Sequence, residues 1–343
     1  MLQVLHIINS LETGGAETNL LRLIKGLDTQ GINCCVWPLR RGGALTQAYL
    51  DAGIRLCGPG SVADVDLVHG WLYAGCVAAS LRAGKRPTVW GIRHVPGNDE
   101  SVTTRLSLWL MKNTFRADLV VCNSQAAEKQ HKQIGVRANT WQVINNGISP
   151  AVINARSRAD LRFHLGLEEN DILLLQVARL HPHKGQRLLL EAVQPLLDKY
   201  SHVKLLFVGR GCDKLPANSQ IHVVDGSDDL APFYNAADWL INPSLSESFP
   251  TVVLEAMSYG IPVVATDVGG TRELLDQAGV LVAATSTDLM LAIDKAIHMD
   301  SQERNHYVAA GLERSSQFSF KRMVTNYASA YRQIFEASEK RSG

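Results

Sequence analysis

Short apolar runs alternate with longer amphipathic stretches along the whole chain, and each run has the length of a β-strand. Buried strands of parallel sheets are apolar runs of this kind, and amphipathic helices connect them in α/β proteins. In the first half, strands are expected at 2–8, 33–37, 67–69, 88–90, 119–122 and 142–144. In the second half, they are expected at 172–178, 204–208, 221–223, 239–241, 262–265 and 280–282. The pattern therefore predicts an α/β protein built from parallel sheets.

Turn signals divide this pattern in two. Asn-Gly and Ser-Pro fall within 145–150, where we expect a linker. The prediction is a first domain at 1–148, a second at 149–318 and a last segment at 319–343. From Phe320 to Phe335 the apolar residues recur at three-and-four spacing, which predicts a helix with one apolar face. The pattern alone does not identify the surface that covers this face.

Composition narrows the class of protein. A length of 343 residues suits two domains, and 46% hydrophobic with 20% charged residues is typical of a globular chain. The apolar runs are far shorter than the ~20 residues of a membrane-spanning helix. The first residues enter a strand pattern with no secretory signal, and the six cysteines contain no Cys-x-x-Cys pair. We therefore expect a cytoplasmic protein with reduced cysteines in its core.

The segment 243–260 is the most informative for chemistry. A strand ends before it, a loop rich in Ser and Pro follows, and a helix is expected to open near Thr251. Pro250 suits the entry to a helix and Gly260 suits its end. The unbonded N–H groups of a first helical turn bind anions, and this turn would lie at the carboxyl edge of a parallel sheet.

Two glutamates flank this junction. Glu247 precedes the helix and Glu255 lies about one turn inside it. A carboxylate accepts hydrogen bonds from two hydroxyls at once, so it is a common partner of a ribose or hexose diol. The alternative for Glu255 is a solvent-facing helix residue. Its neighbours in the sequence are apolar or small, which favours a role in a site.

This segment resembles the donor-binding motif of the family 4 retaining glycosyltransferases, which have the GT-B fold. In that family two glutamates eight residues apart flank a loop-to-helix junction, as Glu247 and Glu255 do here. The family often has Gly where this chain has Ser248. The resemblance implies that the donor is also contacted by Phe249, Pro250, Thr251 and Val252.

A second segment matches the same family in order. Arg179 and Lys184, five residues apart before Gly185, resemble the family's Arg…Lys-Gly segment. Two cations across such a loop can clamp a diphosphate and stabilise the charge that grows on it as the glycosidic bond breaks. The alternative is a pair of surface cations without a ligand.

In the first half, the matching pieces are shorter. Gly14 and Gly15 resemble the family's N-terminal glycine loop, and glycine lets a backbone approach a phosphate or a sugar. His94 stands where the family has a histidine close to the donor sugar. The alternative for a lone histidine is a structural role.

The resemblance extends over essentially the whole chain. It implies two Rossmann-like domains facing a central cleft (GT-B), with the last helix packing back on the first domain. It implies transfer of a hexose-type sugar, with retention, from a nucleotide diphosphate sugar to a glycan or lipid-linked saccharide. We expect no metal, no other cofactor and no nucleic-acid partner.

Two other functions remain open at this point. An NADP-dependent oxidoreductase could use the glycine loop and Arg40-Arg41, although Gly14-Gly15 lacks the Gly-x-Gly-x-x-Gly spacing. A non-catalytic sugar-binding protein is the other. A metal-dependent transferase would use an Asp-x-Asp motif, and Asp64-Val65-Asp66 has that form but precedes an apolar run, so we expect it to cap a strand.

Charge is distributed unevenly along the chain. Residues 1–148 carry a net charge of +5 and the remainder carries −4. On an expected helix at 101–116, Arg105, Lys112 and Arg116 form a narrow stripe beside Trp109. Such a stripe suits contact with an anionic membrane, on the inner face for a cytoplasmic protein. The alternative is a solvated helix face, with the other side packed by Leu106, Leu110 and Phe115.

Overall fold

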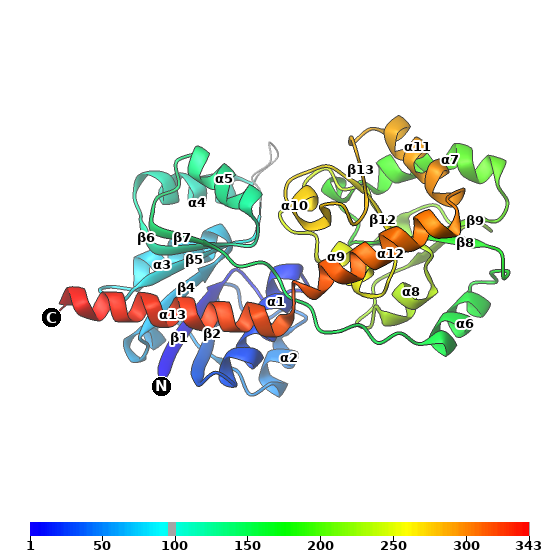
Figure 1. The fold of residues 1–343 in the computed structure, drawn as a ribbon. Coiled ribbons are helices and arrows are strands. Elements are labelled where there is room, and N and C mark those ends of the chain that lie inside the picture. Colours follow the sequence, from blue (N-terminus) through cyan, green and yellow to red (C-terminus); the bar gives the residue numbers. More distant parts are fainter. Residues whose placement is uncertain (95–100, 343) are drawn as a thin grey trace. The chain divides into compact units, whose positions relative to one another are not determined.

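The computed structural model describes residues 1–94 and 101–342, and the chain divides into two compact units. The first unit comprises Met1–Gly147 together with the last helix, α13 (Phe320–Ser342). The second unit is Ile148–Ser319. Figure 1 follows the chain through both units.

The first unit is built on a parallel sheet of seven strands in the order β3-β2-β1-β4-β5-β6-β7. The strands are β1 (Leu2–Ile8), β2 (Ile32–Pro38), β3 (Arg55–Leu56), β4 (Leu67–Trp71), β5 (Thr88–Ile92), β6 (Ala117–Cys122) and β7 (Ala138–Val143). The helices that precede α13 are α1 (Gly15–Asp28), α2 (Thr46–Asp51), α3 (Leu72–Arg82), α4 (Val102–Asn113) and α5 (Gln125–Gln133), with a 3-10 turn η1 (Pro59–Asp64).

The second unit is built on a parallel sheet of six strands in the order β10-β9-β8-β11-β12-β13. The strands are β8 (Ile172–Val177), β9 (Val203–Val208), β10 (Ile221–Val224), β11 (Trp239–Asn242), β12 (Val263–Thr266) and β13 (Val280–Val282). The helices are α6 (Ala155–His164), α7 (Gln186–Lys199), α8 (Ala231–Ala236), α9 (Thr251–Ser258), α10 (Thr271–Leu275), α11 (Ser286–Ile297) and α12 (Ser301–Ser316), with 3-10 turns η2 (Pro182–Lys184) and η3 (Cys212–Lys214).

The two sheets confirm the predicted α/β class with Rossmann-like units. Each expected strand is present, with ends at or within a few residues of the expected ones. The sequence pattern missed β3, because its two residues Arg55 and Leu56 form no apolar run. In each sheet the strand order reverses at one strand, β1 in the first and β8 in the second. Ligands of doubly wound sheets bind at this reversal, beyond the carboxyl ends of the strands.

Helix α13 belongs to the first unit and lies along its sheet (Figure 1). Its apolar face is buried in the same cluster as Leu20 and Leu23 of α1 and Leu67 of β4. The buried residues of α13 are Met323, Val324, Tyr327, Ala328, Ala330, Tyr331 and Ile334. The helix continues beyond the expected end at 335, through polar residues that carry no apolar pattern.

Helix α4 corrects part of the sequence interpretation. It ends at Asn113, so Arg116 lies beyond the helix instead of on its stripe. Ser107 and Met111 are its buried residues, whereas Leu106, which was expected to pack inward, is 56% exposed. The inward face is therefore rotated by about one residue from the expected one. The exposed apolar side chains of α4 are Val102, Leu106 and Trp109.

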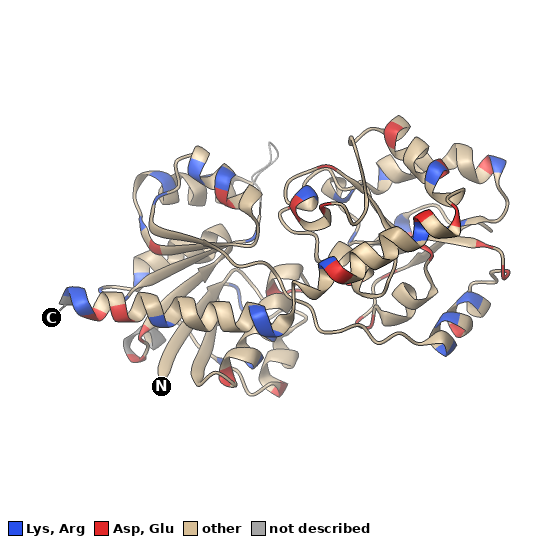
Figure 2. Cartoon of the chain, viewed as in Figure 1, with Lys and Arg blue, Asp and Glu red and all other residues tan. Residues whose placement is uncertain are grey.

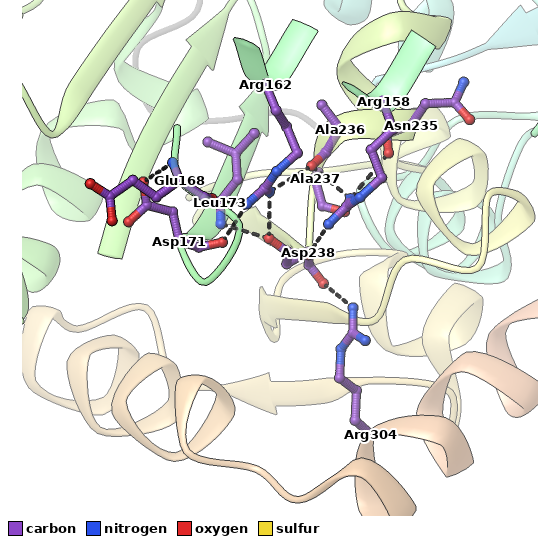
Figure 3. A network of polar contacts seen from close by, with 10 residues as sticks. All are labelled: Arg158, Arg162, Glu168, Asp171, Leu173, Asn235, Ala236, Ala237, Asp238 and Arg304. Atoms are coloured by element: carbon purple, nitrogen blue, oxygen red, sulfur yellow. Dashed lines mark hydrogen bonds and ion pairs between the residues drawn. The ribbon is translucent and has the colours of Figure 1, made fainter. Parts of the chain in front are cut away.

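A network of ion pairs and hydrogen bonds around Asp238 joins α6 to the second sheet (Figure 3). The Asp238 carboxylate lies 2.7 Å from Arg158 Nη2 and 3.1 Å from Arg162 Nη1, and it accepts the N–H of Leu173 at 2.8 Å. Arg162 is 8% exposed and also donates to the carbonyl of Asp171 at 2.7 Å. Removing the carboxylate that pairs with a buried guanidinium lowers the stability of the fold, because the charge is then left buried without a partner.

We expect Asp238→Asn to lower the free energy of unfolding by about 2–3 kcal/mol, because it leaves Arg162 buried without a counter-charge. Asp160→Asn is the matched control, since its pair with Arg156 spans 3.7 Å and Arg156 is 90% exposed. The control should change stability by ~0.5 kcal/mol or less. Urea denaturation followed by circular dichroism measures both. Equal stability of the two variants would contradict a stabilising role for the network.

Candidate functional site

Three loops meet at the carboxyl edge of the second sheet. They follow β8, β11 and β12, which are neighbours of one another through β11, and they lead into α7, α9 and α10. The loops are hydrogen-bonded to each other: Leu245 N–H donates to the His183 carbonyl at 2.8 Å, and Gly270 N–H donates to the Glu247 carbonyl at 3.3 Å. The carboxyl edge at the strand reversal is thus covered by one connected group of loops.

Two glycines allow these loops to approach so closely. Gly185 has φ of +69°, and a Cβ there would lie 1.9 Å from the Pro243 carbonyl oxygen. Gly269 has φ of +52°, and a Cβ there would lie 1.7 Å from the Glu247 carbonyl oxygen. Side chains cannot occupy such positions, so both must be glycine. The loop that carries Glu247 is held between the other two.

Glu247 and Lys184, predicted from separate segments, form a close ion pair. Lys184 Nζ lies 2.6 Å from Glu247 Oε1, and Ser244 Oγ donates to the same oxygen at 2.8 Å. Glu247 is 8% exposed. Gln176 Nε2 donates to the Lys184 carbonyl at 2.7 Å, which fixes the backbone of the lysine. The carboxylate is therefore paired with a cation, oriented and nearly buried, and both of these bonds involve one of its oxygens.

Glu255 has a partner that the sequence analysis did not identify. The Tyr234 hydroxyl of α8 donates to Glu255 Oε2 at 2.8 Å, and the ring of Tyr234 stacks on Tyr259 at 5.3 Å. Burial, with the nearby Glu255 charge, raises the pKa of Tyr234 well above its usual value, so this hydroxyl remains a donor. Tyr234 lies 21 residues before Glu255, in another helix, so sequence spacing gave no sign of the contact.

The first turn of α9 begins where the sequence predicted. Pro250 is its N-cap, and its carbonyl accepts the N–H of Val253 at 3.0 Å. Thr251 and Val252 are half-buried at the start of the helix. The ring of Phe249, in contrast, is 5% exposed and packs edge-on against Phe318 at 5.5 Å. That ring belongs to the core of the second unit, so Phe249 can offer a ligand only its backbone.

Arg179 lies in the loop after β8, with an exposed side chain. Its carbonyl accepts a hydrogen bond from Gln186 Nε2 at 2.9 Å, which ties the loop to the start of α7. Among the described residues, its guanidinium forms no ion pair with a carboxylate. Lys184, five residues on, is half-buried and paired with Glu247. The two cations of the expected clamp therefore differ: Arg179 is exposed, whereas Lys184 is held by Glu247.

Gly14 and Gly15 lie after β1, at the carboxyl edge of the first sheet. Gly14 caps α1 in an extended conformation, with φ of −161°, which any residue can adopt. A Cβ at Gly14 would lie 2.4 Å from Glu17 Oε2, whereas one at Gly15 would meet nothing within 4 Å. A side chain at Gly15 would therefore have space, so no close contact within the described chain requires glycine there.

His94 follows β5 at the same edge of the first sheet. Its ring packs edge-on against Tyr73 at 6.1 Å, and the Tyr73 hydroxyl lies 2.7 Å from His131 Nε2. Burial lowers the pKa of His131 to about 4, so His131 is neutral at pH 7. Residues 95–100, which follow His94, lie outside the described part of the chain.

Arg93, beside His94, has a role that sequence analysis did not assign. Its guanidinium donates to Asn146 Oδ1 at 2.5 Å and to the hydroxyl of Tyr327 on α13. It also lies over the ring of Trp71, 4.7 Å from the ring centroid. Arg93 thereby connects the end of β5 to Asn146, near the end of the segment Met1–Gly147, and to α13. An arginine so enclosed by π faces and neutral acceptors positions the backbone that carries His94.

The Asp64-Val65-Asp66 segment forms a hydrogen bond with the first sheet. Asp66 Oδ2 accepts the N–H of Gln3 at 2.8 Å, at the start of β1, and Asp64 ends η1. Across residues 1–94 and 101–342, no group of three or more His, Cys, Asp or Glu side chains is placed to hold a metal ion.

Two families of known proteins match the chain, one in each half. The family described as "Glycosyltransferase Family 4" matches residues 49–152, and the one described as "Glycosyl transferases group 1" matches residues 171–298. The second match includes the three loops that carry Lys184, Glu247 and Gly269.

Individual relatives agree with these matches. The putative teichuronic acid biosynthesis glycosyltransferase TuaC of Bacillus subtilis is 29% identical over 216 residues, which are 61% of this chain and 55% of TuaC. A D-inositol 3-phosphate glycosyltransferase of Kribbella flavida is 29% identical over 245 residues, 64% of this chain and 57% of that protein. The chain thus matches little more than half the length of these two relatives.

A solved structure extends the likeness to nearly the whole fold. Anabaena Alr3699/HepE, crystallised in complex with UDP-glucose, superposes with a TM-score of 0.84 at 23% identity, over 97% of this chain and 100% of that one. The two family matches assign the chain to family 4 of the glycosyltransferases, and the likeness to this structure, with the two Rossmann-like sheets, shows the GT-B fold.

Proposed function

We propose that this protein transfers a hexose-type sugar from a nucleotide diphosphate sugar to a glycan or lipid-linked saccharide, with retention at the anomeric carbon and without a bound metal. The observation that carries the proposal is the Lys184–Glu247 pair, fixed at the carboxyl edge of the second sheet beside the first turn of α9. Family membership supports the reaction class. The UDP-glucose bound to HepE supports a UDP-sugar as the first donor to test.

The charges of the site suit a leaving diphosphate. Arg179 and the first N–H groups of α9, at Thr251 and Val252, are positive features on neighbouring loops. Preorganised donors of this kind stabilise negative charge as it develops, at no cost of reorganisation. Lys184 adds a fixed cation next to Glu247. A metal ion is not required for this task.

The two glutamates suit different parts of the donor. Glu255, held by Tyr234 one turn inside α9, is assigned to the ribose hydroxyls of the nucleotide. Glu247, held by Lys184 and Ser244 in the loop before the helix, is assigned to the transferred sugar. Carboxylates held by other donors keep their orientation and accept hydroxyl hydrogen bonds without reordering. No side chain is assigned as a covalent nucleophile.

The two alternative functions explain fewer features of the site. The family matches disfavour an NADP-dependent oxidoreductase, which would leave the Lys184–Glu247 pair and Glu255 without a role. A non-catalytic sugar-binding protein would bind a nucleotide sugar without consuming it, so turnover separates it from a transferase.

The test of the proposed function is the release of free nucleotide diphosphate from UDP-glucose and GDP-mannose, with water or a saccharide as the acceptor. We expect release from one donor, and we expect it to survive EDTA. Donor binding without release would favour the binding protein. Loss in EDTA with recovery in Mg²⁺ or Mn²⁺ would contradict metal independence, and NMR of the product reports the anomeric configuration.

Arg179→Ala should lower kcat by about 10²–10³, as expected when one preorganised donor to a developing anion is lost. Arg187→Ala is the matched control, because Arg187 is 93% exposed and paired with Glu191 on α7. The control should retain wild-type kcat. A tenfold rise in KM at unchanged kcat for Arg179→Ala would mean that the arginine binds the substrate and transition state equally.

The two glutamates should separate binding from transfer. Glu255→Gln should weaken free UDP by about 10- to 100-fold, the loss expected for hydrogen bonds to a charged acceptor. Glu247→Gln should leave the affinity for free UDP within about twofold of wild type and reduce transfer strongly, because its partner is the sugar. Calorimetry of UDP and the turnover assay measure the two effects. Equal loss of UDP affinity in both variants would contradict this division.

We also propose that helix α4 contacts an anionic membrane, which suits a lipid-linked acceptor. Its outer face exposes Val102, Leu106 and Trp109, which are 72%, 56% and 56% exposed, beside the cations Arg105 and Lys112. Figure 2 shows the Lys and Arg positions on this helix. Apolar anchors flanked by cations are typical of helices that lie in the interface of an anionic bilayer. None of the described helices is both apolar enough and long enough to cross a bilayer.

Changing Arg105 and Lys112 together to Gln should reduce binding to phosphatidylserine-containing liposomes by about 30-fold, since each cation near such a surface contributes ~1 kcal/mol. Donor hydrolysis should not change. A double Gln variant of Arg156 and Arg187, both exposed in the second unit, is the matched control. If the wild-type protein does not bind these liposomes at low salt, the exposed side of α4 is a solvated helix face and the membrane proposal is wrong.

A further inference from the structure

Two cysteines lie on one face of the first sheet, at its edge. In the parallel pair β2–β3, Cys35 is opposite Arg55 and Val36 is opposite Leu56. The next residue, Cys57, continues the ladder, with its N–H donating to the Val36 carbonyl at 2.8 Å. Because side chains alternate along a strand, Cys35, Arg55 and Cys57 share a face. Both cysteines pack against the cluster that contains Leu5 and Val68.

The two thiols are also in chemical contact. A hydrogen bond from the Cys57 thiol, together with the Arg55 guanidinium, lowers the pKa of Cys35 to about 7, although burial acts in the opposite direction. Arg55 is on the surface, above the sulfur. A thiolate beside a cation and within reach of a second thiol is the environment of redox-active cysteines.

The other cysteines differ from this pair. Cys34 is the neighbour of Cys35 on the opposite face, and burial raises its pKa. Burial also raises the pKa of Cys122 and Cys212, to about 12 and about 11. Buried thiols of this kind are inert. The chemistry is therefore concentrated at β2–β3.

We propose that Cys35 and Cys57 form a reversible disulfide, so that this edge of the first sheet is a site of oxidative modification by peroxides. Proton transfer from Cys57 to Cys35 along their hydrogen bond leaves a thiolate at Cys57, whose half-exposed sulfur attacks the peroxide. The O–O bond breaks, Cys57 becomes a sulfenic acid and the other oxygen leaves as water. The Cys35 sulfur attacks the Cys57 sulfur, the S–S bond forms, and the sulfenic oxygen leaves as a second water. In sum, two thiols and one hydrogen peroxide give a disulfide and two waters.

This bond requires the backbone to move, because Cys57 follows Leu56 and so lies diagonal to Cys35 and not opposite it. Two sulfurs in hydrogen-bond contact must approach to the ~2.05 Å of a disulfide. Cys57 lies just beyond a two-residue edge strand, so it is the residue that moves. A disulfide here would fix β3 to β2. In a reducing compartment it would form during oxidative stress and be removed by dithiol reductants.

The test is mass spectrometry of the reduced full-length protein after hydrogen peroxide, with remaining thiols blocked by N-ethylmaleimide. We expect a species lighter by two hydrogen atoms, a linked peptide containing Cys35 and Cys57, and recovery of both thiols in dithiothreitol. A wild-type protein in which these cysteines become only sulfinic or sulfonic acids, or in which Cys34 is the linked residue, would overturn the proposal.

Variants complete the test. Cys57→Ser should abolish the linked species, and Cys34→Ser, the neighbour on the opposite face, should retain it. Circular dichroism confirms that each variant is folded. The peptide map of the wild-type protein tests the proposal by itself. The test therefore does not depend on the folding of either variant. Persistence of the linked species in folded Cys57→Ser would contradict it, and donor turnover by either variant tests the proposed function separately.

Discussion

The close approach of three backbone loops at the carboxyl edge of the second sheet is the constraint on which the site depends. Gly185 lies against Pro243 and Gly269 lies against Glu247, at distances that exclude a Cβ. The loop carrying Glu247 is fixed from both sides, so its carboxylate meets Lys184 with little freedom. Electrostatic catalysis gains from charges that are already in place, since their ordering is part of folding instead of the reaction.

This arrangement makes the site a product of the fold more than of any one motif. The strand order reverses at β8, which brings the loops after β8 and β11 together although about 60 residues separate them. Each charged group has a second residue that holds it: Lys184 has Gln176, Glu247 has Ser244 and Glu255 has Tyr234. Supporting contacts of this kind keep functional side chains in a productive geometry.

In the first unit, too, neighbouring residues hold the backbone near the candidate site residues, although fewer charged side chains take part. Arg93 joins the end of β5 to Asn146 and to Tyr327, so the backbone beside His94 is positioned by α13, the last helix of the chain. Buried His69, whose pKa burial lowers well below its usual value, accepts or donates a hydrogen bond at 2.7 Å to Tyr331. The C-terminal helix therefore supports the edge of the first sheet at which Gly14 and His94 lie.

The sequence by itself determined the α/β class and the strands other than β3, because burial on both faces of a parallel sheet requires local apolar runs. It also indicated Lys184, Glu247 and Glu255, because these residues stand in segments with a recognisable order. Only the tertiary structure decided that Lys184 pairs with Glu247, that Tyr234 holds Glu255, that the Phe249 ring is in the core and that Leu106 is exposed. These outcomes depend on which elements pack together and in what rotation, and that packing joins residues too far apart in the chain for any local pattern to record.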